Sequence, residues 1–261
     1  MLEVYKESGL TPLEFINNIK THYPLNKKIC YTARLDPMAR GVVPILFDEE
    51  CKDMQLYTNL NKTYEVKVFF GYKTDSDDAL GLLENTYENT YENTYKNVYD
   101  NNYRIEDILL KYKSYFEINN NIDNHNEIII KQKYHYFSTK TIAARNKNIK
   151  EINVDHYHDV KLYSSKIINS GEIDFLEWVN ECTKIINKVD KTKNFRQKEI
   201  IDQWQKLALQ NPLLQIEYIK LQLHVGSGFF VRQYIRDISD KIGIPLMCYD
   251  INRISIDYVK K

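Results

Sequence analysis

The sequence lacks an excess of charge of either sign. Lysine and arginine together number 36, aspartate and glutamate also number 36, and the formal net charge at pH 7 is +0. The pI is near 7.0. A neutral total is unusual for a protein that binds nucleic acid, although a local basic stripe can coexist with it. Any nucleic-acid surface on this chain must therefore be local.

Cysteine is scarce and scattered as well. The four cysteines are Cys30, Cys51, Cys182 and Cys248. They show no C-x-x-C spacing, which predicts reduced thiols in an intracellular protein and argues against a disulfide framework or a zinc site. His156 and His158 could offer two imidazoles, but no third ligand stands at motif spacing, so we interpret them as a solvated pair. The sequence predicts no metal and no cofactor.

Long apolar runs are also missing. No stretch has the length of a membrane span, and residues 1–6 have no signal-peptide character. We therefore expect a soluble, cytoplasmic protein with no membrane partner; an organelle or the nucleus stays open as its location. A chain of 261 residues can bury a large core, as one domain or as one domain with an insertion.

What the sequence does contain is a Leu-Asp-Pro turn at Asp36. Pro37 has a fixed φ and biases the residue before it away from the helical region, so the Asp36 carboxylate is restricted. Gly41 follows, and it can adopt a backbone conformation closed to other residues, which lets the chain re-enter a strand. Taken alone, this stretch is equally compatible with an ordinary Asp-Pro turn.

Two further segments change that balance. Residues 61–81 read NKTYEVKVFFGYKTDSDDALG, and residues 225–238 read VGSGFFVRQYIRDI. Together with residues 31–44 they resemble the TruB class of pseudouridine synthases, whose pattern runs G-H-T-G-x-L-D-P-x-A-x-G-x-L-P, D-K-x-Y, G-x-x-T-D-T-x-D-x-x-G and S-x-G-T-Y-I-R. The order and spacing agree, from residue 6 to 81 and again from 216 to 254.

This resemblance implies a mixed α/β fold of the α+β kind, with a large, mostly antiparallel central sheet and peripheral helices. We expect a single catalytic domain over residues 1–261, without the usual C-terminal RNA-binding PUA domain. A low-complexity linker is expected at about 85–103, where tyrosine recurs at every fourth position. These tyrosines could form a stacking platform for bases, but repeat slippage in a tolerant segment is the simpler interpretation. A charged helical insertion is expected at about 172–211.

Local patterns predict individual elements. Thr11 suits a helix N-cap, with Pro12 at the first helical position and Glu14 at the third. Charged and apolar residues alternate over 64–70, which predicts a strand. Residues 230–241 predict a helix that ends at a glycine.

The chemistry implied by the resemblance asks for few groups. Converting uridine to pseudouridine breaks a C–N glycosidic bond, turns the base over and rejoins it through carbon, without redox change, metal or external acceptor. It needs a nucleophilic carboxylate that forms a covalent intermediate, and the motif assigns this role to Asp36. Burial would raise the pKa of a carboxyl, so a fixed cation is required nearby. Arg232 matches the family's partner, and a guanidinium suits a bidentate contact with a carboxylate; a structural salt bridge is the alternative role for this pair.

The target base must leave its stack, which costs a few kcal/mol. Tyr64 matches the family residue that stacks on the flipped base, and such stacking contributes about 1–3 kcal/mol. Phe230 and Ile251 match positions that wall the pocket. Lys62 and Arg253 are predicted either to contact RNA phosphate or to support the loop.

Two matches are weaker. In the family, the acidic turn at 74–78 lies near the catalytic cleft, so Asp75 is expected to order Arg232 or the active-site loop; a turn that caps its own backbone is the alternative. Residues 132–140 occupy the place of the motif Q-x-P-P-x-Y-S-A-x-K, but lack both prolines.

The chain also departs from the family pattern. Tyr31 stands at the RNA-binding position of the histidine in G-H-T-G, and Cys30 and Ala33 replace its two glycines, which predicts a different backbone for the loop. Phe230 replaces the tyrosine of G-T-Y-I-R, so a phenol that could assist proton removal from C5 is absent. Related synthase families use phenylalanine at the equivalent place.

The resemblance implies that the protein isomerises a uridine of RNA, with the T-loop of tRNA as the first expectation, since the family reads that loop largely by its shape. Two alternatives stay open. One is an RNA-binding or RNA-folding protein that has lost turnover, as Tyr31, Phe230 and the missing PUA domain would suggest. The other is a synthase directed to its site by a partner protein or guide RNA. We expect a monomer whose partner is RNA.

Overall fold

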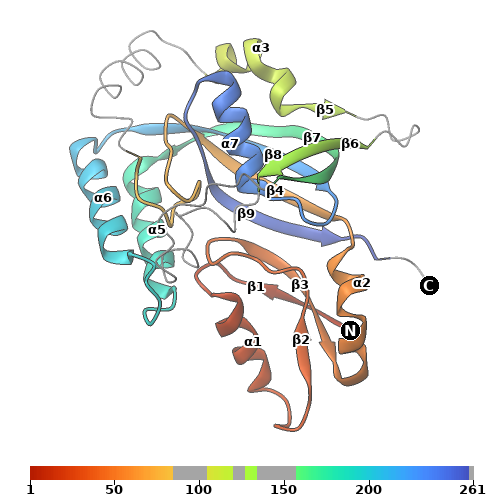
Figure 1. Ribbon diagram of the computed structural model, residues 1–261. Helices are drawn as coiled ribbons and strands as arrows, with labels where there is room; N and C mark the ends of the chain where they lie inside the picture. The colour runs from red at the N-terminus through yellow and green to blue at the C-terminus, as the bar shows by residue number, and fades with distance from the viewer. Residues whose placement is uncertain (85–104, 120–126, 134–156, 259–261) are drawn as a thin grey trace.

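The computed structural model describes residues 1–84, 105–119, 127–133 and 157–258 (Figure 1). The predicted linker at 85–103 and most of the motif at 132–140 lie outside the described residues.

Within the described residues, nine strands form one sheet, in the order β1-β3-β9-β4-β8-β7-β5, with β2 paired to β3 and β6 paired to β7. In the same part of the chain, β3 and β9 form the one parallel ladder, and the other ladders are antiparallel. The predicted large, mostly antiparallel sheet is therefore confirmed. The strands are β1 (Leu2–Lys6), β2 (Ile29–Tyr31), β3 (Arg40–Phe47), β4 (Lys62–Phe70), β5 (Ile118–Asn119), β6 (Ile128–Lys133), β7 (Tyr157–Asp174), β8 (Gln215–Val225) and β9 (Leu246–Ile256).

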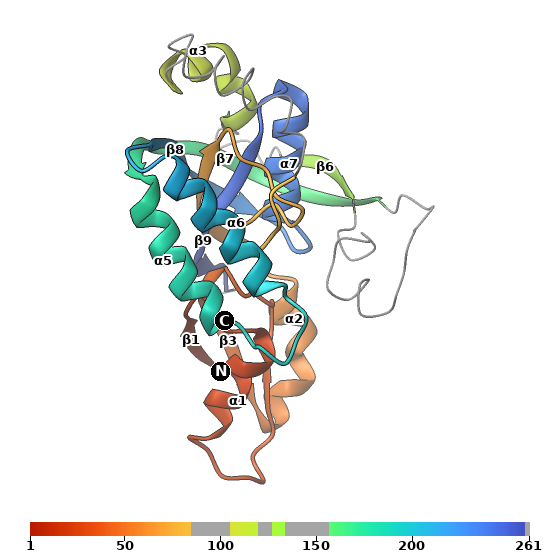
Figure 2. The same cartoon turned by 90° about the vertical axis from the view of Figure 1, so that its left-hand side faces the viewer.

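Helices cover both faces of this sheet. Figure 2 shows strands between the pair α5–α6 on one side and α7 on the other. Among the described helices, none is long and apolar enough to cross a membrane. The helices are α1 (Pro12–Lys20), α2 (Met54–Thr58), α3 (Ile105–Phe116), α5 (Phe175–Lys188), α6 (Gln197–Gln210) and α7 (Val231–Ile242), and a 3₁₀ helix, η1, spans Asp48–Asp53.

The alternation predicted for residues 64–70 is confirmed, and it divides the core in two. Tyr64, Val66 and Val68 of β4 belong to a cluster that includes the apolar face of α7. Phe69, which points the opposite way, belongs to a second cluster built largely from α5 and α6. Successive side chains of a strand point to opposite faces of the sheet, so β4 contributes to both cores.

The predicted helix ends are also confirmed. Thr11 caps α1 in a capping box with Glu14, and Pro12 is the first helical residue. Helix α7 ends at Gly243, whose φ of 71° lies in the left-handed region. A short connection joins β8 to α7, and the first turn of α7 carries Arg232, which contacts Asp36.

Candidate active site

Asp36 lies in the loop between β2 and β3, and the N-terminal segment holds the backbone of that loop in place. Each carbonyl oxygen of residues 36–39 accepts a hydrogen bond from residues 6–9. The bonds run from Lys6 Nζ to Asp36 O (3.1 Å) and Ala39 O (2.7 Å), from the Gly9 amide to Pro37 O (2.8 Å), and from Ser8 Oγ to Met38 O (3.1 Å). Burial lowers the pKa of Lys6 to about 8. The loop is thus fixed through its backbone, which leaves the Asp36 carboxylate available for other contacts.

Two residues with positive φ flank this loop. Gly41 has a φ of 125°, and a Cβ there would come within 2.3 Å of the Arg253 carbonyl oxygen on β9. The predicted special conformation of Gly41 is confirmed, and it allows β3 to pair with β9. Ala33 has a φ of 50°, a left-handed conformation that disfavours residues with a Cβ.

Arg232 joins the Asp36 loop to the acidic turn at 74–78. Its Nη2 donates to Asp36 Oδ2 at 2.7 Å, while its Nη1 donates to the Ser76 carbonyl oxygen at 2.6 Å and lies 3.2 Å from Asp78 Oδ2. The sequence predicted a bidentate contact with Asp36, but the contact observed joins one nitrogen to one oxygen, because the acidic turn engages Nη1. The Asp36 side chain is 54% exposed and that of Arg232 only 19%. The pair thus holds a fixed cation against a carboxylate that solvent, and hence a substrate, can reach.

The charges around Arg232 keep it ionised. Burial lowers its pKa, but the carboxylates of Asp36, Asp78 and Asp77 outweigh that effect and the net pKa is raised. Burial raises the pKa of Asp78 in spite of Arg232. It also raises the pKa of Asp77 to about 6, although Asp77 forms an ion pair with Arg236.

Asp75 takes a different partner from the one expected. It forms a bidentate ion pair with Arg196, at 2.7 and 2.9 Å, and accepts a hydrogen bond from the Leu82 amide at 3.0 Å. Arg232 is held instead by Asp78 and the Ser76 carbonyl oxygen of the same turn. The expected contact of Asp75 with Arg232 is therefore wrong, because Arg196 engages both carboxylate oxygens of Asp75, while the alternative of a turn that caps its own backbone is confirmed by the bond from the Leu82 amide.

Two of the residues predicted to form the base pocket, Tyr64 and Ile251, lie on one face of the sheet. Tyr64 and Ile251 are buried, and share a hydrophobic cluster with Leu35, the residue before Asp36, and with Phe229. Tyr64 on β4 pairs with Arg253 on β9, and Tyr31 is half-buried at the end of β2. The fold thus brings these segments together from distant parts of the sequence.

Phe230 is held by a side chain whose role the sequence did not reveal. Its amide donates to Gln132 Oε1 at 2.8 Å, and its carbonyl oxygen accepts from Gln132 Nε2 at 3.0 Å. Gln132 is fully buried, and the Phe230 ring packs against that of His158 with centroids 5.2 Å apart. The weak motif at 132–140 already contained Gln132, but nothing in the sequence indicated that it would bind the start of α7.

Lys62 and Arg253 are both buried. Lys62 Nζ donates to the Thr58 carbonyl oxygen at 2.5 Å, and Arg253 Nε to that of Val42 at 2.7 Å. Burial, reinforced by the charge of Arg253, lowers the pKa of Lys62 to about 8. Burial argues against contact with phosphate for both residues. Arg253 supports β3 just after the Asp36 loop, whereas Lys62 supports the end of α2.

The described residues contain no group of three or more His, Cys, Asp or Glu side chains that could hold a metal ion. The arrangement found is a carboxylate with a fixed guanidinium beside an apolar wall. It can hold a solvent-accessible carboxylate against a fixed cation, close to an apolar surface.

Comparison with known proteins gives one family. The family described as TruB family pseudouridylate synthase (N terminal domain) matches residues 20–170. The tRNA pseudouridine synthase B of Oceanobacillus iheyensis is 33% identical over 86 residues, which are 33% of this chain and 28% of that protein. The protein of the same name from Aquifex aeolicus is 34% identical over 86 residues, covering 33% and 30%. The matched segments thus span less than a third of the length of these relatives.

Among solved structures, the chain is similar to one in a Cbf5-Nop10-Gar1 complex, with a TM-score of 0.49 and 13% identity. That similarity covers 97% of this chain and 47% of the other. A chain in an H/ACA RNP bound to a substrate RNA containing 2′-deoxyuridine gives a TM-score of 0.48, with 13% identity and coverage of 97% and 45%.

The left-handed backbone at Ala33 gives a first prediction. Replacing Ala33 with glycine should raise the free energy of unfolding by about 1 kcal/mol, because a Cβ in that conformation is strained. Gly41→Ala, which instead adds a Cβ at the other position, should lower the free energy of unfolding by at least about 2 kcal/mol, because the new Cβ meets the β9 backbone. Urea unfolding of both variants measures this, and a destabilised Ala33→Gly protein would contradict the strain argument.

The buried ammonium of Lys62 gives a second prediction. Its pKa falls from 10.5 to about 8 on folding, so between these values the folded protein binds fewer protons than the unfolded chain, and stability rises with pH. Lys62→Met removes this contribution. The free energy of unfolding of the parent, minus that of the variant, should therefore increase by about 2 kcal/mol from about pH 7 to about pH 10. Parallel pH profiles for the two proteins would contradict it.

Proposed function

The chain belongs to the TruB family of pseudouridylate synthases, and we propose that it converts a uridine of RNA to pseudouridine with Asp36 as the nucleophile. The observation that carries this proposal is the contact of 2.7 Å between the exposed carboxylate of Asp36 and the guanidinium of Arg232. These residues lie 196 positions apart, within the two motif segments that the family pattern would bring together.

The reaction can be written for these groups. A carboxylate oxygen of Asp36 forms a bond to C1′ of the flipped nucleotide as the C1′–N1 bond breaks, and the electron pair of that bond leaves with the base. The base turns over, and C5 attacks C1′ and releases the carboxylate. The proton is lost from C5, and N1 takes up a proton. Nothing is oxidised or reduced, so no redox cofactor enters the scheme.

Arg232 holds and aims the carboxylate in this scheme, since its guanidinium is itself fixed by the acidic turn. Tyr64 is the proposed stacking partner of the flipped base, with Phe230 and Ile251 as pocket walls. Arg253 supports β3 just after the loop, and Lys62 supports the end of α2. Tyr31 is proposed to lie beside the bound RNA.

We propose the T-loop uridine of tRNA as the first substrate to test, because the relatives that match the motif segments are named tRNA pseudouridine synthase B. RNA binding without turnover is the second candidate, since Tyr31 and Phe230 replace the family's histidine and tyrosine. The contact between Asp36 and Arg232 favours catalysis over that alternative, because a protein that only binds RNA has no need for an exposed carboxylate beside a fixed cation.

The proposal predicts that Asp36→Asn abolishes turnover. With a tRNA T-arm labelled by 5-tritiated uridine, the parent should release tritium, and the variant should release it at least about 1,000-fold more slowly, because an amide cannot act as the nucleophile. Asp53→Asn, a change at an exposed aspartate on η1, is the matched control and should keep the parent's rate.

A filter-binding measurement on the same RNA distinguishes the alternatives. Tight binding without tritium release by the parent would favour the non-catalytic function. If Asp36→Asn released tritium at the parent's rate, Asp36 would not be the nucleophile.

A further inference from the structure

The helices α5 and α6 lie side by side against the rest of the molecule (Figures 1 and 2). They occupy the stretch at 172–211 that we propose to be an insertion in the family fold. Both the Asp36 loop and the acidic turn at 74–78 contact this helix pair or the residue that precedes α6.

The first contact is an ion pair at the start of α6. Arg196 donates from Nη1 and Nη2 to the two carboxylate oxygens of Asp75, at 2.7 and 2.9 Å. The side chains are only 15% and 16% exposed. Arg196 adopts a left-handed backbone conformation, with a φ of 61°, which costs free energy for a residue with a Cβ. A strained residue is retained where surrounding contacts hold it, and this ion pair is such a contact.

The acidic turn connects Arg196 to Arg232, because it contacts both residues. Asp75 N donates to the Leu82 carbonyl oxygen and Asp75 Oδ1 accepts from the Leu82 amide, which closes the turn. Within it, Thr74 Oγ1 donates to the Asp78 carbonyl oxygen at 2.7 Å. Asp78 in turn contacts Arg232. Three residues of one short turn therefore connect Arg196 to the guanidinium that holds Asp36.

The same helix pair fixes the far end of the turn. Trp204 Nε1 on α6 donates to the Ala79 carbonyl oxygen at 3.3 Å, and Gln203 Oε1 accepts from the Leu83 amide at 3.0 Å. Trp204 is buried in the second hydrophobic cluster with Ala79. The turn is thus held at both ends by α6.

Helix α5 touches the other loop. Gly9, whose amide binds the Pro37 carbonyl oxygen, packs so closely that a Cβ would lie 2.9 Å from Lys188 Cβ and 3.0 Å from the Ile185 carbonyl oxygen. Met38, two residues after Asp36, belongs to the hydrophobic cluster of α5 and α6. The helix pair therefore contacts both supports of the Asp36–Arg232 pair.

We propose that Arg196 is a positioning residue for the reaction, and that α5 and α6 act through it to hold Arg232 against Asp36. The inference rests on the proposed function for its catalytic consequence, but the geometry it invokes is independent of the RNA. Without Arg196, Asp75 would be a largely buried carboxylate without its cation, and the turn that orients Arg232 would relax to hydrate it.

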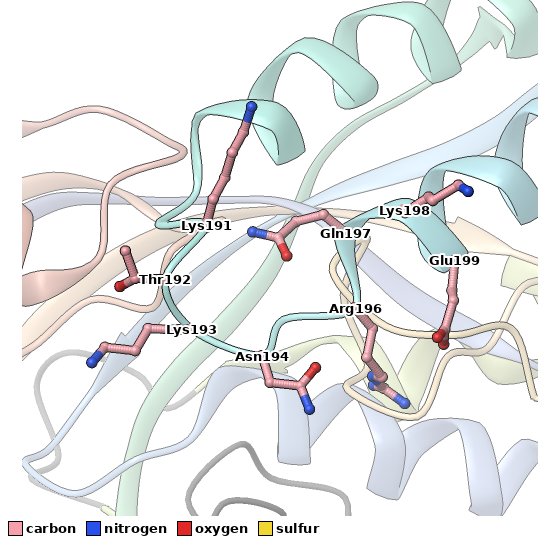
Figure 3. Close-up of a pocket in the computed structure, with 8 residues that line it drawn as sticks. All are labelled: Lys191, Thr192, Lys193, Asn194, Arg196, Gln197, Lys198 and Glu199. Carbon is pink, nitrogen blue, oxygen red and sulfur yellow. The ribbon is translucent and has the colours of Figure 1, made fainter.

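Arg196 also lies in a basic loop that offers a competing role. Figure 3 shows it among the residues that line a hollow of about 430 Å³. Lys191 and Lys193 of that loop, and Lys198 in the first turn of α6, are exposed, and exposed lysines could contact RNA phosphate. Arg196 itself is turned to Asp75, which favours positioning over a phosphate contact, and the experiment below separates the two.

The test compares Arg196→Ala and Arg196→Lys with a control at another ion pair of the same helix pair. Lys184→Ala removes the pair between Lys184 and Glu181, which is 67% and 63% exposed, and exposed pairs contribute little. Single-turnover tritium release and the Kd for the T-arm RNA are measured for each protein. We expect Arg196→Ala to slow the chemical step by about tenfold to a hundredfold with little change in Kd. Arg196→Lys should recover part of the rate, and Lys184→Ala should keep all of it.

An NMR measurement tests the geometry without any RNA. The Nε–Hε signal of Arg232, assigned by its loss in Arg232→Lys, should shift and broaden in Arg196→Ala and remain unchanged in Lys184→Ala. This signal also decides the proposal if the parent releases no tritium, in which case the proposed function fails while the positioning inference is judged on Arg232 alone.

Three results would overturn the inference. The first is an unchanged Arg232 signal in Arg196→Ala. The second is a parental single-turnover rate in that variant. The third is a change in Kd with the rate intact, which would assign Arg196 to RNA binding instead.

Discussion

The guanidinium of Arg232 is the group on which both halves of the site depend. One of its nitrogens binds the Asp36 carboxylate and the other binds the acidic turn. Because the turn supplies a buried carboxylate from Asp78 and a carbonyl oxygen from Ser76, the cation stays in place when Asp36 changes its charge or its bonding. In the proposed mechanism the carboxylate is charged in one step and esterified in the next, and such a partner keeps the cation in place when that charge is lost.

The Asp36 loop is also held in place, but through its backbone and not through a side chain. The carbonyl oxygens of Asp36 and Ala39 accept hydrogen bonds from Lys6, whose ammonium is buried and has a lowered pKa. A cation placed among backbone carbonyls orders the loop without consuming the Asp36 side chain. The loop and the turn are therefore fixed by different partners, and the contact between Arg232 and Asp36 joins them.

How much of this the sequence could predict depends on the range of the interaction. The cap at Thr11, the alternation in β4 and the end of α7 are local, and each was predicted correctly from neighbouring residues. The pairing of Asp36 with Arg232 was predicted only because the motif order resembled a family. Periodicity alone cannot bring together residues 196 positions apart. The bidentate geometry was wrong, because the prediction did not include the competing turn.

The contacts that were missed have a common character. Gln132 binds the backbone of Phe230, Lys6 binds backbone carbonyls, and Arg196 binds a carboxylate more than 100 residues away. The tertiary structure determines each partner. A buried amide or ammonium must form hydrogen bonds, but no sequence pattern predicts which residue it will bind.

The zero net charge can now be interpreted in physical terms. Asp75, Asp77 and Asp78 of one turn are paired with Arg196, Arg236 and Arg232. These three arginines are thereby directed inward, so they contribute little to the field that an approaching RNA would meet. Apart from Arg34, which is exposed in the Asp36 loop, a phosphate-binding surface on the described residues would then be built mainly from lysines. Lysine binds phosphate as a point charge and does not read sequence, so in the proposed function such lysines would position the RNA, and the choice of uridine would depend on the residues around Asp36.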